Sequence, residues 1–504
     1  MEDKPKDECG VVAVYAPGRD VRWIAYRALG LLQHRGQESA GISVTDKDLI
    51  WTMADLGLAR DVFNAGEYLN ALPSEASAAV GHVRYGTCII EGFDTFSKKK
   101  QKEIMLRAAQ PMPDNSDDKK IDIAVGFNGD VPNYRDFIEA DPKLLKDSVS
   151  DADIIKRMIL YEINAGHNPA AAVKEVVNAL AGSAFSLAVL FKDRRENKDG
   201  IIAVRDPNGF RPFVLGSLND GEGWMIASES QAIKMNQGEI VRGMEPGEMI
   251  VVDRDGLQTE QAFPKELVNE TFCVMEEIYL MRPDSEINGQ GVENMRFRSG
   301  QTLSKRFSVK ADVVVGVPDS GISAAYGYAF ASGLPIRQGL VKNRVATERS
   351  FIAQNASGEE SDGGPDDQRQ EVVFEKLVTN PWVVEGQRVV LVDDSVVRGN
   401  TLKVLVKALR EAGAKEVHVR VGSPPIISEC HYGIDIGSKD ELIAPGRQRA
   451  EIAEIVGADS LEYLHLLDLK KAIGAAATKR CYGCMTGEYP TSLRKPVSIQ
   501  ESNL

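Results

Sequence analysis

The sequence predicts two folded parts: a β-rich layered domain, followed by an α/β domain with a parallel sheet. A chain of 504 residues is longer than one hydrophobic core usually serves. Up to about residue 260, short apolar runs recur with few helical patterns between them. From about residue 295 the pattern becomes strand, helix, strand, which is typical of a parallel sheet with covering helices.

In the first half, we expect a helix that is N-capped by Asp20 and runs to about Gln33. The basic run Ser97–Lys102 has no apolar residues, so we expect a solvated loop there. Strands are expected where apolar residues alternate or run continuously, at Ala184–Phe191, Ile201–Val204 and Glu248–Val252.

In the second half, a helix is expected to stop near Gly413, since glycine commonly ends helices. The segment Ser357–Glu371 is acidic, contains glycine and proline, and lacks large apolar residues, so it should be a surface loop. Buried strands are expected at Ala311–Val317, Val389–Val392 and Glu416–Val421.

Composition excludes several classes of protein. A formal charge of −14 argues against a general nucleic-acid binder. No apolar run approaches the roughly 20 residues of a membrane span. The polar start MEDKPKDECG is no secretory signal, and six cysteines in so long a chain are no disulfide framework. We therefore expect a cytoplasmic protein with no membrane or nucleic-acid partner.

The most informative segment is Arg388–Thr401, RVVLVDDSVVRGNT. An apolar run leads into Asp393 and Asp394, and a loop of hydroxyl and glycine residues then precedes an amphipathic helix. Loop N–H groups and a helix N-terminus attract a phosphate, whereas two carboxylates suit sugar hydroxyls or Mg²⁺. The residues indicate a sugar-phosphate site; the alternative is an ordinary strand–loop–helix crossover with an acidic turn.

As written, this segment resembles the phosphoribosyl-pyrophosphate (PRPP) signature of type I phosphoribosyltransferases. The resemblance implies an α/β domain with a parallel sheet, a 5′-phosphate cradle at 395–401, a pyrophosphate loop at VPDS and a basic loop at KNRVATERSF. It implies Mg²⁺ bound by Ser320, Asp393 and Asp394. The residues implied to bind PRPP are Asp319, Ser320, Lys342, Arg344, Arg349, Asp393, Asp394, Ser395, Val397, Arg398, Gly399, Asn400 and Thr401.

Near the N-terminus, Cys9 precedes the strand-like run Val11–Tyr15, and taken alone it is a buried cysteine. Four further motifs follow in order: HRGQE from His34, GHVRY from Gly81, Asn128-Gly129 and Ser150-Asp151. Together they resemble the glutaminase domain of N-terminal-nucleophile amidotransferases, an α+β hydrolase fold of four αββα layers. The roles implied are catalysis by Cys9, with Asn128 and Gly129 at the oxyanion, and glutamine binding by Arg35, Gly36, Arg84 and Asp151.

Removal of Met1–Glu8 would leave Cys9 with a free α-amine, which has a pKa near 8 and can take the thiol proton. Two further motifs, Arg205–Pro212 and Ser228–Ser230, extend the resemblance. With both halves, the chain resembles the glutamine PRPP amidotransferase family, which makes 5-phosphoribosylamine in the first committed step of purine synthesis. The implied organisation is a propeptide (1–8), a glutaminase domain (9–260), a phosphoribosyltransferase domain (261–475) and a C-terminal segment (476–504).

Four cysteines, Cys273, Cys430, Cys481 and Cys484, suit an iron–sulfur cluster or structural zinc by residue type, and buried thiols are the plain alternative. Their positions resemble those of the family branch that holds a [4Fe–4S] cluster, which favours the cluster. Cys88 is left over, and we expect it to be inert.

The resemblance further implies a dry passage for ammonia, purine nucleotides as feedback inhibitors and a homo-oligomer, either a tetramer or a dimer. The chain departs from the family pattern at Gly86, Phe127, Val345 and Asn400, and in an insertion between Thr87 and Ala109. Two alternatives stay open: an enzyme that uses external ammonia, and a non-catalytic sensor of PRPP or purine nucleotides.

Overall fold

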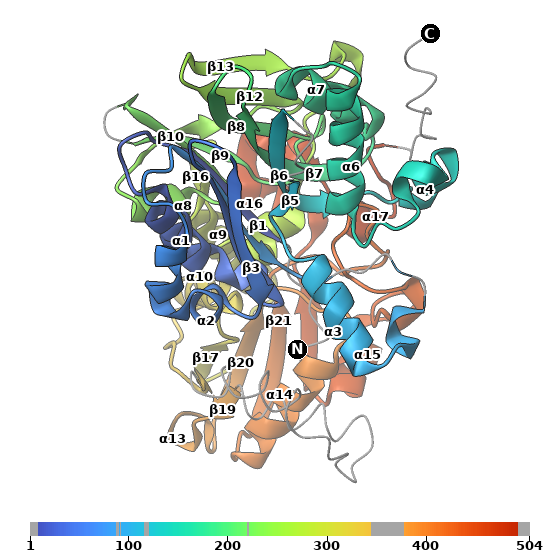
Figure 1. Ribbon diagram of the computed structural model, residues 1–504. Helices are drawn as coiled ribbons and strands as arrows, with labels where there is room; N and C mark the ends of the chain where they lie inside the picture. Colours follow the sequence, from blue (N-terminus) through green and yellow to red (C-terminus); the bar gives the residue numbers. More distant parts are fainter. Residues whose placement is uncertain are drawn as a thin grey trace.

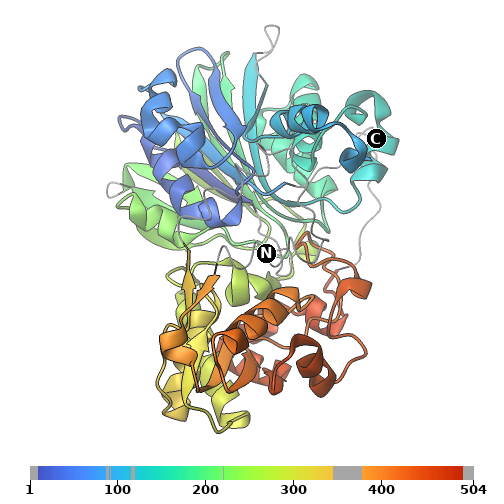
Figure 2. The same cartoon turned by 90° about the horizontal axis from the view of Figure 1, so that it is seen from below.

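The computed structural model describes residues 9–86, 90, 92–114, 120–218, 221–343 and 377–491. The propeptide (1–8), Cys88 and the acidic segment (357–371) lie outside these ranges. The N-terminal half, coloured blue to green, and the C-terminal half, coloured yellow to red, form two lobes in contact (Figure 2). In the described part of the chain, no helix is long and apolar enough to cross a membrane.

The N-terminal lobe contains two antiparallel sheets packed face to face. The first sheet has the order β11 (Glu239–Gly243), β9 (Val214–Leu218), β10 (Gly223–Ala227), β1 (Gly10–Tyr15), β4 (Ala78–Arg84), β2 (Ser39–Thr45) and β3 (Ile50–Leu56). The second has the order β13 (Gly256–Gln261), β12 (Glu248–Asp253), β8 (Lys198–Arg205), β7 (Ala184–Asp193), β6 (Ile121–Asp130) and β5 (Met112–Asp114). Val11, Val80 and Leu190 belong to the apolar cluster that joins the sheets.

Helices cover the outer face of each sheet, which completes four αββα layers (Figure 1). α1 (Val21–Leu32) and α8 (Ser230–Met235) pack on the first sheet, and α6 (Asp151–Asn164) and α7 (Pro169–Ala179) pack on the second. The expected fold class is thereby confirmed for this lobe. Shorter helices are α2 (Ala59–Val62), α4 (Tyr134–Ala140) and α5 (Pro142–Leu145).

One local expectation for this lobe was confirmed in position but not in its capping bond, and another was wrong. Asp20 stands at the N-cap of α1, but its carboxylate makes no cap bond and instead accepts two hydrogen bonds from Arg22, at 2.8 and 2.6 Å. The basic run expected as a loop lies in helix α3 (Lys98–Arg107), which Ser97 caps by accepting a hydrogen bond from the N–H of Lys100. Favourable helix propensity and a serine cap outweigh the lack of apolar residues there.

The C-terminal lobe is a parallel sheet between helices, as expected. The sheet order is β17 (Val313–Gly316), β20 (Arg388–Asp393), β21 (Glu416–Val421) and β22 (Ser460–Tyr463). One face packs against α9 (Val292–Arg306), α10 (Gly321–Ser332) and α16 (Leu466–Ile473), and the other against α14 (Asn400–Glu411) and α15 (Arg449–Val456). α14 ends just before Gly413, whose φ of 92° lies in the left-handed region that favours glycine.

Two small antiparallel strand pairs and a short helix complete this lobe: β15 (Glu286–Ile287) with β16 (Gln290–Gly291), β18 (Leu340–Lys342) with β19 (Leu377–Thr379), and α13 (Pro381–Val384). The last described elements, β23 (Arg480–Cys481) and α17 (Gly483–Thr486), return to the junction between the lobes. There β23 pairs in parallel with β14 (Phe272–Cys273), so Cys273 lies opposite Cys481.

Helices α9 and α10 cross at very close range through two glycines. A Cβ atom added to Gly327 would overlap the carbonyl oxygen of Phe297, and one added to Gly300 would overlap that of Ala324. Gly327→Ala should therefore lower the free energy of unfolding by about 1–3 kcal/mol, because the helices must separate. Urea or thermal denaturation measures the change.

The matched control is Gly30→Ala on the exposed side of α1, where an added Cβ meets no atom within 4 Å. This replacement should raise stability by roughly 0.5–1 kcal/mol, since alanine favours a helix over glycine. Equal effects of the two replacements would contradict the close crossing.

Candidate active sites and a cysteine cavity

The paired acids lie where the neighbouring parallel strands β17 and β20 end. Asp393 is the last residue of β20, and Asp394 follows it; they are 2% and 3% exposed. The N–H of Val317 donates to the carbonyl of Val392 at 2.9 Å, which holds the loop after β17 beside the acids. Strand ends of a parallel sheet meet at one edge, so the expected juxtaposition of the two motifs is observed.

Hydroxyl groups from both loops reach Asp394. Ser320, from the loop after β17, donates to one carboxylate oxygen, and Ser395 donates to the other at 2.6 Å. The N–H of Asp394 donates to the Asp393 carboxylate at 2.9 Å. Asp319 binds the ammonium of Lys342 at 2.5 Å, so the expected pyrophosphate loop and the first residue of the expected basic loop are in contact. Arg344 and Arg349 lie outside the described residues.

The loop after the acids ends at the N-terminus of α14. Gly399 has a φ of 84° and directly precedes the first helical residue, Asn400, whose side chain is exposed. Thr401 is buried, and the first N–H groups of the helix point out of its end. A loop that leads into a helix N-terminus is the local structure that the sequence predicted, and such a helix end favours an anion.

Two loop residues use their side chains elsewhere. The guanidinium of Arg398 binds Glu441 at 2.5 Å, and the side chain of Val397 is buried in the hydrophobic core. Both side chains are therefore engaged within the protein.

Cys9 immediately precedes β1, and the neighbouring ends of β1 and β4 surround it. Its Sγ contacts the carbonyl oxygen of Tyr85 at 3.9 Å, just after β4. Burial raises the pKa of the Cys9 thiol, against smaller lowering effects from Tyr85 and Arg84. The thiol therefore needs a base beside it to react near neutral pH.

The expected oxyanion donor lies on β6, across the sandwich from β4. Asn128 is 1% exposed, and within the described structure its Nδ2 has no hydrogen-bond partner. His82 of β4 donates from Nε2 to the carbonyl of Phe127 at 3.0 Å, and the N–H of Phe127 donates to Gln110 at 2.7 Å. Burial lowers the pKa of His82 to about 3, so the ring is neutral and fixes the strand beside Asn128.

Asp151 begins α6, behind the Ser150 cap. One carboxylate oxygen accepts from the N–H of Val131 at 3.0 Å; among the described residues, the other is buried without a partner. Burial, and then the charge of Asp130, raise the pKa of Asp151, whereas Arg84 lowers it. A cation placed at the free oxygen would satisfy it and restore the ionised form.

Arg35 has a different place from the one expected. It was expected to line a substrate pocket, but its buried guanidinium binds Glu229 at 2.8 Å and Glu276 at 2.7 Å. Its Nε donates to the carbonyl of Cys9 at 3.3 Å. Gly36 packs against the Arg84–Tyr85 peptide, where an added Cβ would lie 2.5 Å from the Arg84 carbonyl carbon.

Comparison with known proteins identifies both lobes. Residues 102–235 match the glutamine amidotransferase domain, and residues 288–421 match the phosphoribosyl transferase domain. Amidophosphoribosyltransferase 1, chloroplastic, of Arabidopsis thaliana is 37% identical over 503 residues, covering 99% of this chain and 81% of the relative. Amidophosphoribosyltransferase of Bacillus subtilis is 36% identical over 494 residues, covering 97% and 95%.

The chain belongs to the amidophosphoribosyltransferase family. It is a glutamine PRPP amidotransferase, which carries out the first step of purine biosynthesis. A solved structure of the Bacillus subtilis amidotransferase, complexed with ADP and GMP, is 36% identical and has a TM-score of 0.80, covering 96% of this chain and 98% of the other. The two-domain resemblance stated from the sequence is confirmed.

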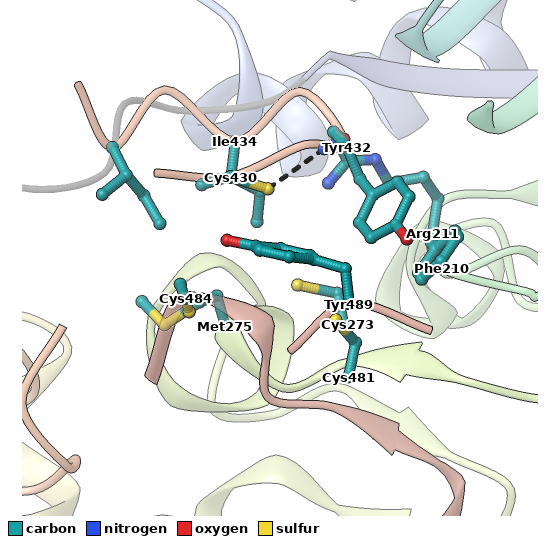
Figure 3. Close-up of a pocket in the computed structure, with 11 residues that line it drawn as sticks. Phe210, Arg211, Cys273, Met275, Cys430, Tyr432, Ile434, Cys481, Cys484 and Tyr489 are labelled. Atoms are coloured by element: carbon teal, nitrogen blue, oxygen red, sulfur yellow. Dashed lines mark hydrogen bonds between the residues drawn. The ribbon is translucent and has the colours of Figure 1, made fainter. Parts of the chain in front are cut away.

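In this amidophosphoribosyltransferase, the four cysteines singled out from the sequence line one cavity of about 20 Å³ at the junction of the lobes. Cys273 and Cys481 come from paired strands, Cys484 from α17, and Cys430 from the loop after β21 (Figure 3). The four thiols are free, and burial raises the pKa of each. The ring of Tyr489 lies between them (Figure 3).

Sequence reasoning assigned no role to Glu229, Glu276, His82 or Glu38, although three of these, Glu229, His82 and Glu38, lie within motifs that it quoted. Glu229 is the central residue of the Ser228–Ser230 motif and binds both Arg35 and His34. Burial alone would raise the pKa of Glu229, but His34 and Arg35 outweigh it and hold that pKa below its ordinary value. The signal that could have identified Glu229 from the sequence is an acidic residue in one quoted motif that can pair with Arg35 in another.

The Arg35 ion pairs join the lobes, since Glu276 precedes the transferase sheet. Glu276→Ala should lower the free energy of unfolding by about 3–5 kcal/mol, because it leaves buried charge undercompensated. The control is Glu286→Ala, which removes an exposed pair with Lys234 at 3.4 Å and should cost about 0–1 kcal/mol. Chemical denaturation of the two variants measures the difference, and equal losses would contradict a structural role for the Arg35 cluster.

Proposed function

We propose that Cys9 hydrolyses glutamine and that the ammonia passes to PRPP bound at the ends of β17 and β20. The observation that carries this proposal is that two of the buried, unpartnered polar atoms in the described N-terminal lobe, Asn128 Nδ2 and Asp151 Oδ1, belong to residues expected to contact glutamine. A donor and an acceptor left without partners in a buried site are costly unless a ligand uses them. Glutamine provides a partner for both atoms. The oxyanion that develops on its amide can accept a hydrogen bond from Asn128 Nδ2, and its α-ammonium can donate one to Asp151 Oδ1.

In this mechanism the α-amine of Cys9, exposed by removal of residues 1–8, takes the thiol proton. The thiolate attacks the amide carbon, and Asn128 with the N–H of Gly129 stabilises the oxyanion. Collapse of this intermediate breaks the C–N bond as the α-ammonium of Cys9 gives its proton to the departing ammonia, and water then hydrolyses the Cys9 thioester to release glutamate. Asp151 binds the α-ammonium and Arg84 binds the α-carboxylate. Arg35 holds the carbonyl of Cys9 and thereby positions the nucleophile, a role supported by the 3.3 Å contact.

At the second site, Asp393 and Asp394 bind the ribose hydroxyls of PRPP, and residues 395–401 cradle the 5′-phosphate. Asp319 and Ser320 contribute to the pyrophosphate loop, and Lys342, Arg344 and Arg349 form the basic loop that closes over it. Buried carboxylates with a serine hydroxyl are oxygen donors of the type that Mg²⁺ prefers, so Ser320, Asp393 and Asp394 suit that ion. Bound there, Mg²⁺ would neutralise charge on the departing pyrophosphate.

Free ammonia reacts, whereas ammonium has no lone pair, so a dry passage between the sites favours transfer. Buried contacts between the lobes support a junction that excludes water, for example the ion pair of Arg35 with Glu276 at 2.7 Å and the stack of Phe210 on Tyr432, whose ring centroids are 4.0 Å apart. We further propose a cytoplasmic homo-oligomer, a tetramer or a dimer, with purine nucleotides as feedback inhibitors. The ADP and GMP bound by the Bacillus subtilis protein support the proposal of feedback inhibition by purine nucleotides.

The domain divisions expected from sequence, at 9–260, 261–475 and 476–504, are part of the same proposal.

We also propose that Cys273, Cys430, Cys481 and Cys484 hold a [4Fe–4S] cluster. The donor set fits, because four thiols from segments far apart in the chain line one cavity. The Tyr489 ring must then turn away from the thiols, and the cluster would tie the C-terminal segment to both lobes.

Two replacements test the two-site assignment. Cys9→Ala should abolish glutamine-dependent synthesis of phosphoribosylamine but leave ammonia-dependent synthesis intact, because only the nucleophile is lost. Asp393→Asn should lower both rates by at least about 100-fold, since it weakens stabilisation of charge at the shared acceptor site. Pyrophosphate release from PRPP measures both rates. A glutamine-specific defect in Asp393→Asn, or loss of both activities in Cys9→Ala, would contradict the assignments.

Pyrophosphate release together with the intact mass of the purified chain separates the two alternatives. The intact mass shows whether the chain starts at Cys9. Retention of residues 1–8, with activity on ammonia but not on glutamine, would support an ammonia-dependent enzyme. No turnover with either nitrogen source would favour a PRPP or nucleotide sensor.

The cluster has its own test. Anaerobically purified protein should contain four irons per chain and show absorption that air bleaches. Cys484→Ser should lose iron, while Cys9→Ala, the matched thiol replacement outside the cavity, should retain it. Stoichiometric zinc in place of iron would contradict the proposal.

A further inference from the structure

Glu38 and Arg84 face each other at the edge of the glutaminase site. Glu38 directly precedes β2, Arg84 ends β4, and the strands pair so that Ser39 lies opposite Arg84. The N–H of Glu38 donates to the carbonyl of Arg84 at 3.0 Å, and the Glu38 carboxylate forms an ion pair with the Arg84 guanidinium. The Arg84 side chain is only 3% exposed, so water screens this pair weakly.

Gly86 is what leaves room for the carboxylate. A Cβ atom at position 86 would overlap the carboxylate group of Glu38. Any other residue here would therefore displace Glu38 from Arg84 or be displaced itself. The absence of a side chain at position 86, noted from the sequence as a departure from the family pattern, has a specific structural consequence.

A cavity of about 470 Å³ opens beside this pair. Glu38, Arg84 and Gly86 line one side, and Ile104 and Met105 of helix α3 line another. The cavity offers the Glu38 side chain a position away from Arg84, with its carboxylate still able to meet water. Glu38 can therefore turn without disturbing the strand that carries it.

We propose that Glu38 is an internal competitor for the α-carboxylate of glutamine. This inference rests on the proposed function, in which Arg84 holds that carboxylate. With Glu38 in place, the charge of Arg84 is already neutralised, and a second carboxylate meets a like charge. Glutamine must displace Glu38 into the cavity before Arg84 can bind it, so Glu38 sets the affinity for glutamine without taking part in the chemistry.

The first experiment replaces Glu38 by glutamine, which keeps the shape and removes the charge. E38Q should lower the KM for glutamine about tenfold, the scale expected from removing a like charge at a poorly screened site. The kcat with glutamine and the ammonia-dependent rate should not change. The matched control is E103Q on the exposed surface of α3, which should leave the KM unchanged. An unchanged or raised KM in E38Q would overturn the inference.

The second experiment displaces the carboxylate from the other side. G86A should lower the KM as E38Q does, and the double variant should show no further decrease, because both changes remove the same contact. Independent, additive decreases would contradict a shared cause. Ammonia-dependent activity reports on folding in each variant.

Arg84→Ala separates this inference from the function on which it rests. A raised KM for glutamine in Arg84→Ala supports the carboxylate assignment, and the result for E38Q then decides the competitor alone. An unchanged KM in Arg84→Ala would overturn the assignment of Arg84 itself, together with the competitor.

Discussion

The buried charge of Arg35 constrains the rest of the structure. Its guanidinium compensates Glu229 in the glutaminase lobe and Glu276 ahead of the transferase sheet, and it also binds the backbone of Cys9. A buried charge is tolerated only while its partners stay in place. Arg35 therefore connects the strand that follows Cys9 with the segment that leads into the second lobe. A displacement of either lobe would move the Arg35 guanidinium and, with it, the backbone of Cys9.

The residues proposed to bind the substrates lie at the ends of strands and helices, while the central residues of these elements form the hydrophobic cores. Asp393 ends a strand whose apolar residues are fully buried, and Asp151 begins a helix that packs on the second sheet. Rigid packing behind each residue fixes the position of its polar atoms in advance. That explains how Asn128 can keep an unpartnered amide nitrogen: the sheet, and the neutral ring of His82, hold it regardless of a ligand.

Much of this was readable from the sequence because it is local. Short apolar runs mark the strand before Asp393 and the alternation of strands with helices, and a single glycine marks the end of α14. The structure follows these signals. The position of Arg35 could not be read, since its two partners are 194 and 241 residues away and pairing over such separations leaves no periodic trace. Helix α3 was missed because the lack of apolar residues in Ser97–Lys102 was given more weight than the helix propensity of its lysines and its capping serine. The pairing of Glu38 with Arg84 likewise depends on a strand register that the sequence does not display.

The parallel pairing of β14 with β23 has a consequence for how the protein is made. Cys273 is synthesised long before Cys481 and Cys484, which lie close to the end of the described chain. During synthesis the first lobe and the transferase sheet can each gather a core from nearby segments, but the cysteine cavity cannot close until the last segment leaves the ribosome. Completion of this cavity thus requires translation past Cys484, and a chain ended before Cys481 would lack two of its four thiols.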